Sequence, residues 1–175
     1  SRSFGQRISN LKELRPIVSN FAVRAAEKLR NERQKCSQVS VFVRTSPFNR
    51  NKPQHSDLKT IELFTPTNDT RDILVAAKKG LLPIFRSGYD YAKAGIILNK
   101  FSDEKTKQYS LFKDPNEPKQ NMRLMKYLDQ MNNYETQIYY ASQNTKKWSP
   151  MKQNMTSPKY TTNWYELPNC LLYTS

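Results

Sequence analysis

The segment CSQVSVFVRTS spans Cys36–Ser46 and alternates apolar with polar residues. That alternation predicts a β-strand with one buried face and one open face. The two faces are Val39, Val41 and Val43 on one side, and Ser40, Phe42 and Arg44 on the other. Because the apolar face needs a cover, we expect helices on that side of a sheet.

The flanking sequence supplies those helices and three more strands. Apolar residues recur every three or four positions in two segments, about Leu11–Arg33 and Asp69–Arg86, which predicts amphipathic helices, with Asp69 as the N-cap of the second. The first helix's stripe is Leu14, Val18, Phe21, Ala22, Ala25 and Leu29. The other predicted strands are Ser1–Ile8, Leu58–Phe64 and Tyr91–Phe101. The order β-α-β-β-α-β indicates an α+β fold, a four-stranded sheet with two helices on one face.

Positive charge is concentrated in this first domain, residues 1–101. The whole chain of 175 residues carries a formal net charge of +14. Residues 1–101 contain 19 basic and 8 acidic residues, so most of the excess lies there. A basic domain with an open sheet face is suited to a polyanion, and nucleic acid is the leading candidate.

The rest of the chain is less regular. Residues 102–118 are rich in Lys, Asp and Pro and are predicted to be a linker, with Leu111 and Phe112 as an apolar island. A C-terminal region, residues 119–175, follows. We expect a helix over Glu117–Asn132, a short strand over Gln137–Ala141, and irregular structure from Trp148 onward.

Several classes of protein are disfavoured. Cys36 and Cys170 are too far apart for a disulfide framework, and with His55 as the single histidine no zinc site is expected. Asp103 and Glu104 form the one adjacent acidic pair, which is expected to be solvated linker charge. No apolar run reaches the about 20 residues that span a bilayer, so a soluble intracellular protein without membrane contact is expected.

Specific stretches of the sequence resemble a known family. They are Ser1–Gly5, Ala25–Gln34, Val41–Phe48, Pro66–Ile73, Tyr91–Gly95 and Ser157–Trp164 with Leu167 and Pro168. In this order they are similar to the C-terminal part, the little finger and tail, of Y-family DNA polymerases of the UmuC branch, the ImpB/MucB/SamB family. The final Asn169–Ser175 resembles nothing in that family.

The resemblance implies a DNA-binding face on the open side of the sheet. In Y-family little fingers this face grips phosphates near the primer–template junction, with little readout of sequence. The matching residues here are Arg2, Ser3, Phe4 and Gly5 on the first strand, Arg44, Thr45 and Ser46 on the second, and Tyr91, Lys93 and Gly95 on the fourth. Gly5 and Gly95 are expected to let the backbone approach a phosphate closely.

A second implied site is a peptide in the linker. Gln108-Tyr109-Ser110-Leu111-Phe112 resembles the pentapeptide by which bacterial polymerases bind the sliding clamp. Leu111 and Phe112 would insert into an apolar cleft, and Gln108 would hydrogen-bond at its edge. Tyr109 departs from the more common Leu, which predicts weaker binding.

The resemblance also implies partners and a division of labour. The expected partners are damaged or primer–template DNA, the sliding clamp, the UmuD′ dimer and RecA, in the bacterial cytoplasm near the nucleoid. The function implied is error-prone translesion synthesis in the SOS response. The catalytic carboxylates and their Mg²⁺ ions would lie in domains outside this sequence, so no cofactor and no catalytic residue is expected here.

Other readings of the residues stay open. A ferredoxin-like RNA-recognition domain would stack bases on aromatics of its two central strands, and Phe42 is one candidate. An enzyme in its own right is disfavoured because no paired acids, histidine cluster or reactive cysteine site is evident. A purely structural interaction protein would show negligible DNA affinity at low salt.

Overall fold

The computed structural model describes residues 1–49, 51–105, 117–133, 138–143 and 155–167, with side chains omitted for 117–120 and 133. It confirms the predicted order β-α-β-β-α-β, followed by one further helix and a short 3-10 turn. The elements are β1 (Arg2–Ile8), α1 (Leu11–Asn31), β2 (Gln34–Thr45), β3 (Ser56–Thr67), α2 (Thr70–Ile84), β4 (Tyr91–Asp103), α3 (Glu117–Asn133) and η1 (Trp164–Glu166).

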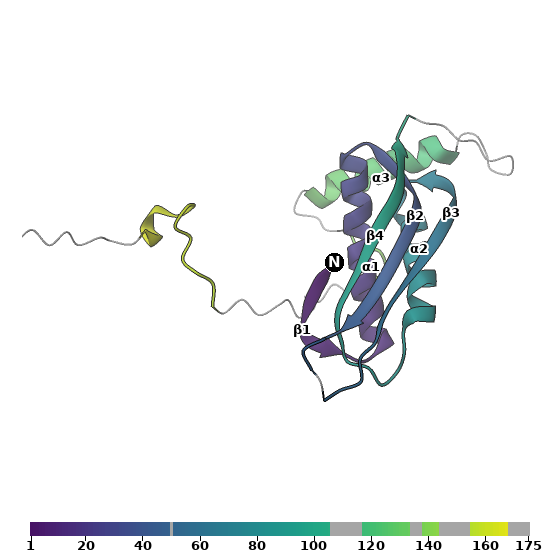
Figure 1. Cartoon of the computed structure of the whole chain (residues 1–175). Helices are drawn as coiled ribbons and strands as arrows, with labels where there is room; N and C mark the ends of the chain where they lie inside the picture. Colours follow the sequence, from purple (N-terminus) through teal and green to yellow (C-terminus); the bar gives the residue numbers. More distant parts are fainter. Residues whose placement is uncertain (50, 106–116, 134–137, 144–154, 168–175) are drawn as a thin grey trace, which may run out of the picture.

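The four strands form one sheet in the order β1-β4-β2-β3, and every neighbouring pair is antiparallel. Helices α1 and α2 lie side by side on one face of this sheet (Figure 1). The described residues leave the opposite face open. The predicted α+β architecture is therefore confirmed.

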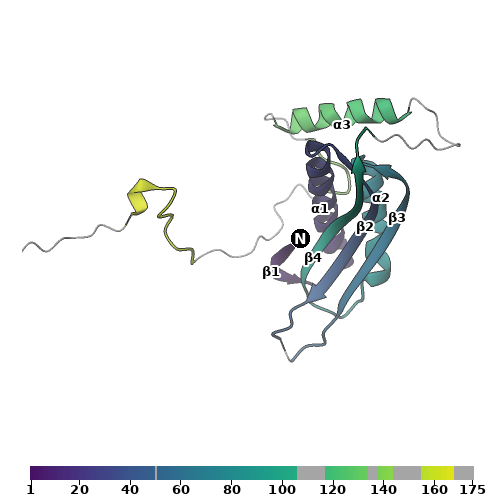
Figure 2. The same cartoon turned by 45° about the horizontal axis from the view of Figure 1, so that its top comes forward.

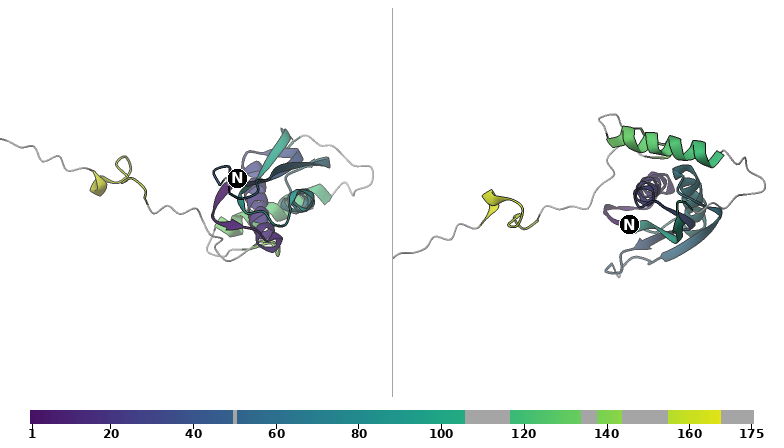
Figure 3. Two further views of the ribbon diagram at one scale, coloured as in Figure 1. Left: turned by 60° about the horizontal axis from the view of Figure 1, so that its bottom comes forward. Right: turned by 90° about the horizontal axis from the view of Figure 1, so that it is seen from above.

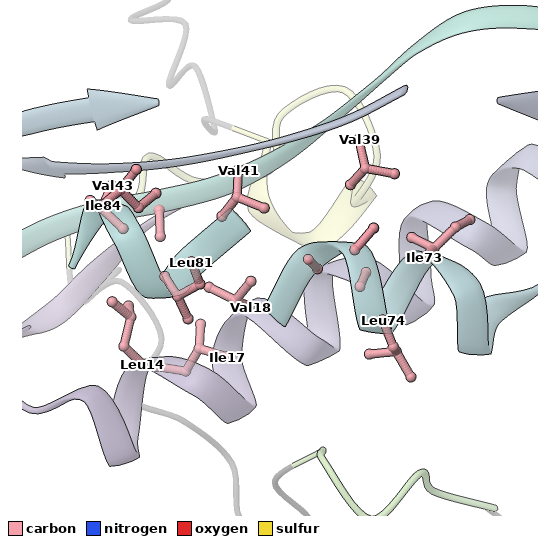
Figure 4. Close-up of a cluster of buried hydrophobic side chains, with 14 of the residues drawn as sticks. Leu14, Ile17, Val18, Val39, Val41, Val43, Ile73, Leu74, Leu81 and Ile84 are labelled. Atoms are coloured by element: carbon pink, nitrogen blue, oxygen red, sulfur yellow. The ribbon is translucent and has the colours of Figure 1, made fainter. Parts of the chain in front are cut away.

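The core lies between the sheet and the two helices. Figure 4 shows the valines of β2 pointing toward apolar side chains of both helices. Val39, Val41 and Val43 are fully buried, as their alternation predicts. They meet Leu14, Ile17 and Val18 of α1, and Ile73, Leu74, Leu81 and Ile84 of α2. Phe21 and Ala25, which the stripe assigned to the core, are only partly buried at its edge.

Side-chain caps fix where the two helices begin. The Asp69 carboxylate accepts a hydrogen bond from the Arg71 backbone N–H at 2.8 Å, which confirms the predicted N-cap. Asn10 caps α1 by accepting from the Lys12 N–H at 2.9 Å. Helix α2 ends at Ile84, before the predicted Arg86, and Gly88 adopts its positive φ of 87° in the turn beyond it.

The predicted linker begins too early. Strand β4 continues to Asp103, pairing with Gln34 of β2. The Glu104 N–H donates to the Arg33 carbonyl at 2.9 Å, and its carboxylate accepts from Asn68 Nδ2 at 3.2 Å. Residues 102–105 thus belong to the first domain, because backbone pairing with β2 outweighs their polar composition.

Helix α3 packs on the first domain. Figures 2 and 3 show it crossing α1 and α2 on the side away from the sheet. Met125 points inward and is 1% exposed. Asp129 of α3 accepts two hydrogen bonds of 2.6 Å from the Arg30 guanidinium of α1. The predicted helix over Glu117–Asn132 is confirmed, and it is docked on the first domain.

The short strand predicted over Gln137–Ala141 is wrong where the structure describes it, because residues 138–141 form no strand. Tyr140 instead starts a turn in which the Gln143 N–H donates to its carbonyl at 2.8 Å. The Tyr140 hydroxyl donates to the Met125 sulfur at 3.5 Å, so this turn packs against α3. Gln137 and Trp148 lie outside the described residues.

Candidate nucleic-acid interface

One cross-strand row of polar side chains runs over all four strands on the open face. Ser3 of β1 is opposite Lys93 of β4, Lys93 is opposite Arg44 of β2, and Arg44 is opposite Ser56 of β3. Partners in an antiparallel pair point to the same side of the sheet, so these four side chains share the open face. Three strand spacings make the row about 14 Å long. We call it the Ser3–Ser56 row.

The charge of this row is uncompensated within the described residues. Arg44 and Ser3 are exposed and Lys93 is half-exposed. No ion pair found in the described part of the chain includes Arg44 or Lys93. The row therefore presents two adjacent cations flanked by two hydroxyls, a combination suited to the phosphates of a nucleic acid. Ser56 was missed in the sequence, although it continues the alternation of Leu58, Thr60 and Glu62.

The next row along the strands is apolar. Phe42 is opposite Gly95 of β4 on one side and Leu58 of β3 on the other. A Cβ added at Gly95 would lie 2.6 Å from Phe42 Cε1 and 2.4 Å from Ser1 Cβ. The predicted close approach of a phosphate at Gly95 is therefore wrong, because the Phe42 ring and Ser1 occupy that space. Gly95 is needed to seat Phe42.

Three of the predicted DNA contacts are buried. The side chains of Phe4, Thr45 and Tyr91 all belong to the interior. Phe4 alternates with Ser3, and Thr45 alternates with Arg44, so both face the helices. Tyr91 is turned inward by a register shift in which Thr45 pairs with Tyr91 directly after Arg44 pairs with Lys93. The prediction that these side chains contact DNA is wrong.

Tyr91 has a structural role at the end of the sheet. Its hydroxyl accepts from the Arg86 N–H at 2.9 Å and donates to the Arg86 carbonyl at 3.2 Å. It also lies 3.2 Å from Nδ1 of His55, and the backbone N–H of His55 donates to the Thr45 hydroxyl at 3.0 Å. Burial raises the pKa of Tyr91. Thr45, His55 and Tyr91 thus tie the ends of β2 and β4 to the loops beside them.

Arg2 lies on the other side of the sheet from the Ser3–Ser56 row. Its partner in β4 is Ala94, which is buried under the helices. The Arg2 side chain is exposed and lies next to α1. The prediction that Arg2 belongs to the open face is therefore wrong. Gly5 and Ser46 are half-exposed, and a role for them in binding stays a prediction.

The Cys36 thiol is buried in the first domain. Burial raises the pKa of the Cys36 thiol to about 11. In the described part of the chain, no group of three or more His, Cys, Asp or Glu residues is arranged to hold a metal ion. None of the helices described there is long and apolar enough to cross a membrane.

The predicted clamp peptide, Gln108 with Leu111 and Phe112, lies outside the described residues, as does Cys170.

Comparison with known proteins identifies two families along the chain. The impB/mucB/samB family C-terminal domain matches residues 1–111, and a domain of unknown function, DUF4113, matches residues 122–169. The first match contains the whole sheet with α1 and α2. The second contains most of α3, the turn at Tyr140 and η1.

Individual relatives match nearly the whole chain. Protein UmuC of Salmonella typhimurium is 43% identical over 170 residues, which are 95% of this chain and 40% of the relative. Protein SamB of Salmonella typhimurium is 41% identical, and protein MucB of Escherichia coli is 42% identical, each over 96% of this chain and 40% of the relative. The chain thus spans about two fifths of the length of these relatives.

A solved structure with a related arrangement is the little finger domain of PolIV in complex with the beta-clamp processivity factor. The similarity has a TM-score of 0.41 and 15% sequence identity, and it covers 63% of this chain and 94% of that one.

Proposed function

The chain belongs to the impB/mucB/samB family. We propose that it is the DNA-gripping C-terminal part of an error-prone translesion DNA polymerase of the SOS response. The single observation that carries the DNA-binding role is the Ser3–Ser56 row, with its two uncompensated cations on an open sheet face. Its length of about 14 Å is close to the width of about 12 Å of a B-DNA major groove. The row would hold phosphates and leave sequence unread.

Loss of the two cations tests this proposal. We compare Arg44→Gln/Lys93→Gln with Lys78→Gln/Lys79→Gln, a control of equal charge change on the exposed surface of α2. Binding to duplex DNA is measured by fluorescence anisotropy over a range of salt concentrations. Because each phosphate contact contributes about 0.9 to the salt slope, the first variant should lower that slope by about 2, and the control should change it little. Equal slopes for both variants would refute the assignment.

Binding to RNA by a stacking mechanism is the competing function. Its best support is Phe42, a half-exposed aromatic in one of the two central strands. The other central strand presents Lys93, Gly95 and Ile97 at the equivalent positions, and none is aromatic. Single-stranded RNA is therefore expected to bind no better than duplex DNA, and tighter RNA binding in the same assay would favour the competitor.

The tether to the sliding clamp is the second part of the proposal. Its support is the pattern of Gln108, Leu111 and Phe112, placed between the end of β4 at Asp103 and the start of α3 at Glu117. Leu111→Ala/Phe112→Ala should abolish clamp binding in surface plasmon resonance, because two apolar anchors are removed. Lys113→Ala/Asp114→Ala is the control from the same segment. Unchanged affinity of the first variant would exclude the tether.

Protein partners are proposed for the C-terminal region. Leu124, Tyr127 and Met131 of α3 are exposed on a helix otherwise docked on the first domain. Trp164 and Tyr165 of η1 are 86% and 99% exposed. Exposed apolar side chains of this kind are suited to partners such as the UmuD′ dimer and RecA. Polymerisation and its Mg²⁺ ions are assigned to parts of the enzyme outside this sequence, so this chain alone should extend no primer.

A further inference from the structure

A cavity of about 650 Å³ opens between the edge strand β1 and helix α1. It lies on the helix side of the sheet, apart from the Ser3–Ser56 row. The residues that matter to its chemistry are Arg2, Phe21, Arg24, Glu27, Lys28 and Asn31. Phe21 and Ala25 form an apolar part of the lining, and charged side chains surround it.

The charge of this cavity is positive. Arg24 and Lys28 lie one turn apart on α1, and Arg2 approaches from β1, with Glu27 as the one acidic residue among the described residues of the lining. All three cations are exposed, and none of the ion pairs found among the described residues includes them. Like charges one turn apart repel each other, so an anion bound between them would relieve that repulsion.

The cavity and the Ser3–Ser56 row lie on opposite sides of the edge strand β1. Arg2 and Ser3 are adjacent in β1 and point to opposite sides of the sheet. Lys93 is opposite Ser3 on the open face, and Arg2 lines the cavity on the helix side. Cationic side chains therefore lie on both sides of β1. Strand β1 contains no acidic residue, so a strand of nucleic acid that leaves the row could pass over it to the cavity.

We propose that this cavity is a second DNA site, which holds one or two nucleotides of a single strand. Its volume suits a nucleotide and is too small for a duplex. The apolar lining can receive a base, and Arg2, Arg24 and Lys28 can receive the phosphates on either side of it, the arrangement that single-strand binding uses. The inference rests on the proposed function, since the strand would come from DNA held by the row.

The test separates single-stranded from duplex contacts. Two DNAs share one duplex, and one of them carries a 12-nucleotide single-stranded overhang. For each protein variant the measured quantity is the ratio of its affinities for the overhang DNA and the blunt DNA. Arg24→Gln/Lys28→Gln is compared with Lys78→Gln/Lys79→Gln, which has the same charge change on α2. All four substituted positions are exposed, so both variants should fold, and their melting temperatures would check this.

We expect the overhang to increase the affinity of the unmodified chain about tenfold and Arg24→Gln/Lys28→Gln to remove most of that gain. Its affinity for blunt DNA should stay within about twofold of the control. An equal overhang gain in both variants, or no gain in the unmodified chain, would overturn the inference. Failure of the proposed function itself is distinct, because the unmodified chain would then show no salt-dependent affinity for the blunt duplex.

Discussion

One partly buried ion pair joins α3 to the first domain, and removal of its acid should weaken the docking of the helix. The Arg30 guanidinium makes two hydrogen bonds of 2.6 Å to Asp129, one of 2.8 Å to the Asn68 carbonyl and one of 2.9 Å to the Thr70 hydroxyl. The side chains of Arg30 and Asp129 are only 8% and 22% exposed. Asp129→Asn keeps the shape of the side chain and removes its charge.

The burial of Arg30 and Asp129 sets how much docking stability Asp129→Asn should lose. Loss of one partner of a fully buried pair costs about 3–5 kcal/mol, and an exposed pair contributes about 0.2–1 kcal/mol. Because Asp129 retains some contact with water and Asn can still accept one hydrogen bond, we expect a loss of about 2–3 kcal/mol. The loss cannot exceed the free energy of docking, since undocking returns Arg30 to water.

Amide hydrogen exchange measured by mass spectrometry reads this loss element by element. In Asp129→Asn, peptides from α3 should lose protection while peptides from β2 and β4 keep theirs. Lys126→Gln is the control, because Lys126 is exposed on the same helix. If α3 exchanges equally in both variants, or if its stability changes by less than about 0.5 kcal/mol, the ion pair does not hold the helix.

Three further predictions concern the first domain. Gly95→Ala should destabilise this domain by about 1–3 kcal/mol in urea unfolding, because the new methyl group overlaps Phe42 and Ser1. The loss of stability should be smaller in a Phe42→Ala background, and an equal loss in both backgrounds would contradict the packing. Tyr91→Phe should lower stability by about 1–2 kcal/mol, because the hydroxyl's two hydrogen bonds to Arg86 are lost. The affinity for duplex DNA should stay unchanged, and weaker DNA binding by a folded Tyr91→Phe protein would show that Tyr91 contacts DNA. In a Cys170→Ser variant, the Cys36 thiol should stay unreactive toward Ellman's reagent at pH 9, since burial raises its pKa to about 11. It should react fully once the chain is unfolded, whereas rapid reaction of the folded protein would show that the thiol is accessible.

The sign of the Cys36 effect on stability follows from the same pKa. The folded state holds the thiol proton more tightly than the unfolded state does. The protonated Cys36 thiol therefore makes its full contribution to stability below pH about 9. This contribution is lost as the pH rises from about 9 through about 11.

The sequence predicts the fold well because the signals for it are local. Alternation in Cys36–Ser46 identifies β2 and its buried valines, and Asp69 identifies the start of α2. The ends of strands are predicted less well. Asp103 and Gln34 are polar residues that pair at the far end of the sheet, and no local pattern distinguishes them from a loop.

The candidate site is predicted less completely because it depends on register. Alternation along each strand already separates Thr45 from Arg44 and Phe4 from Ser3, so it predicts that Thr45 and Phe4 face the helices. Tyr91 is different, because only the register shift beside Arg44 turns it inward. The contact of Phe42 with Gly95 and the pair of Arg30 with Asp129 join residues distant in sequence, and no spacing rule predicts them.

NMR spectroscopy can show whether the open face of the sheet binds DNA. Backbone amide shifts are recorded for the unmodified chain during titration with a primer–template duplex. We expect the largest changes at Ser3, Lys93, Arg44 and Ser56, with little change at Lys78 and Lys79 on α2. Largest changes on α2, with the four residues of the row unaffected, would contradict it.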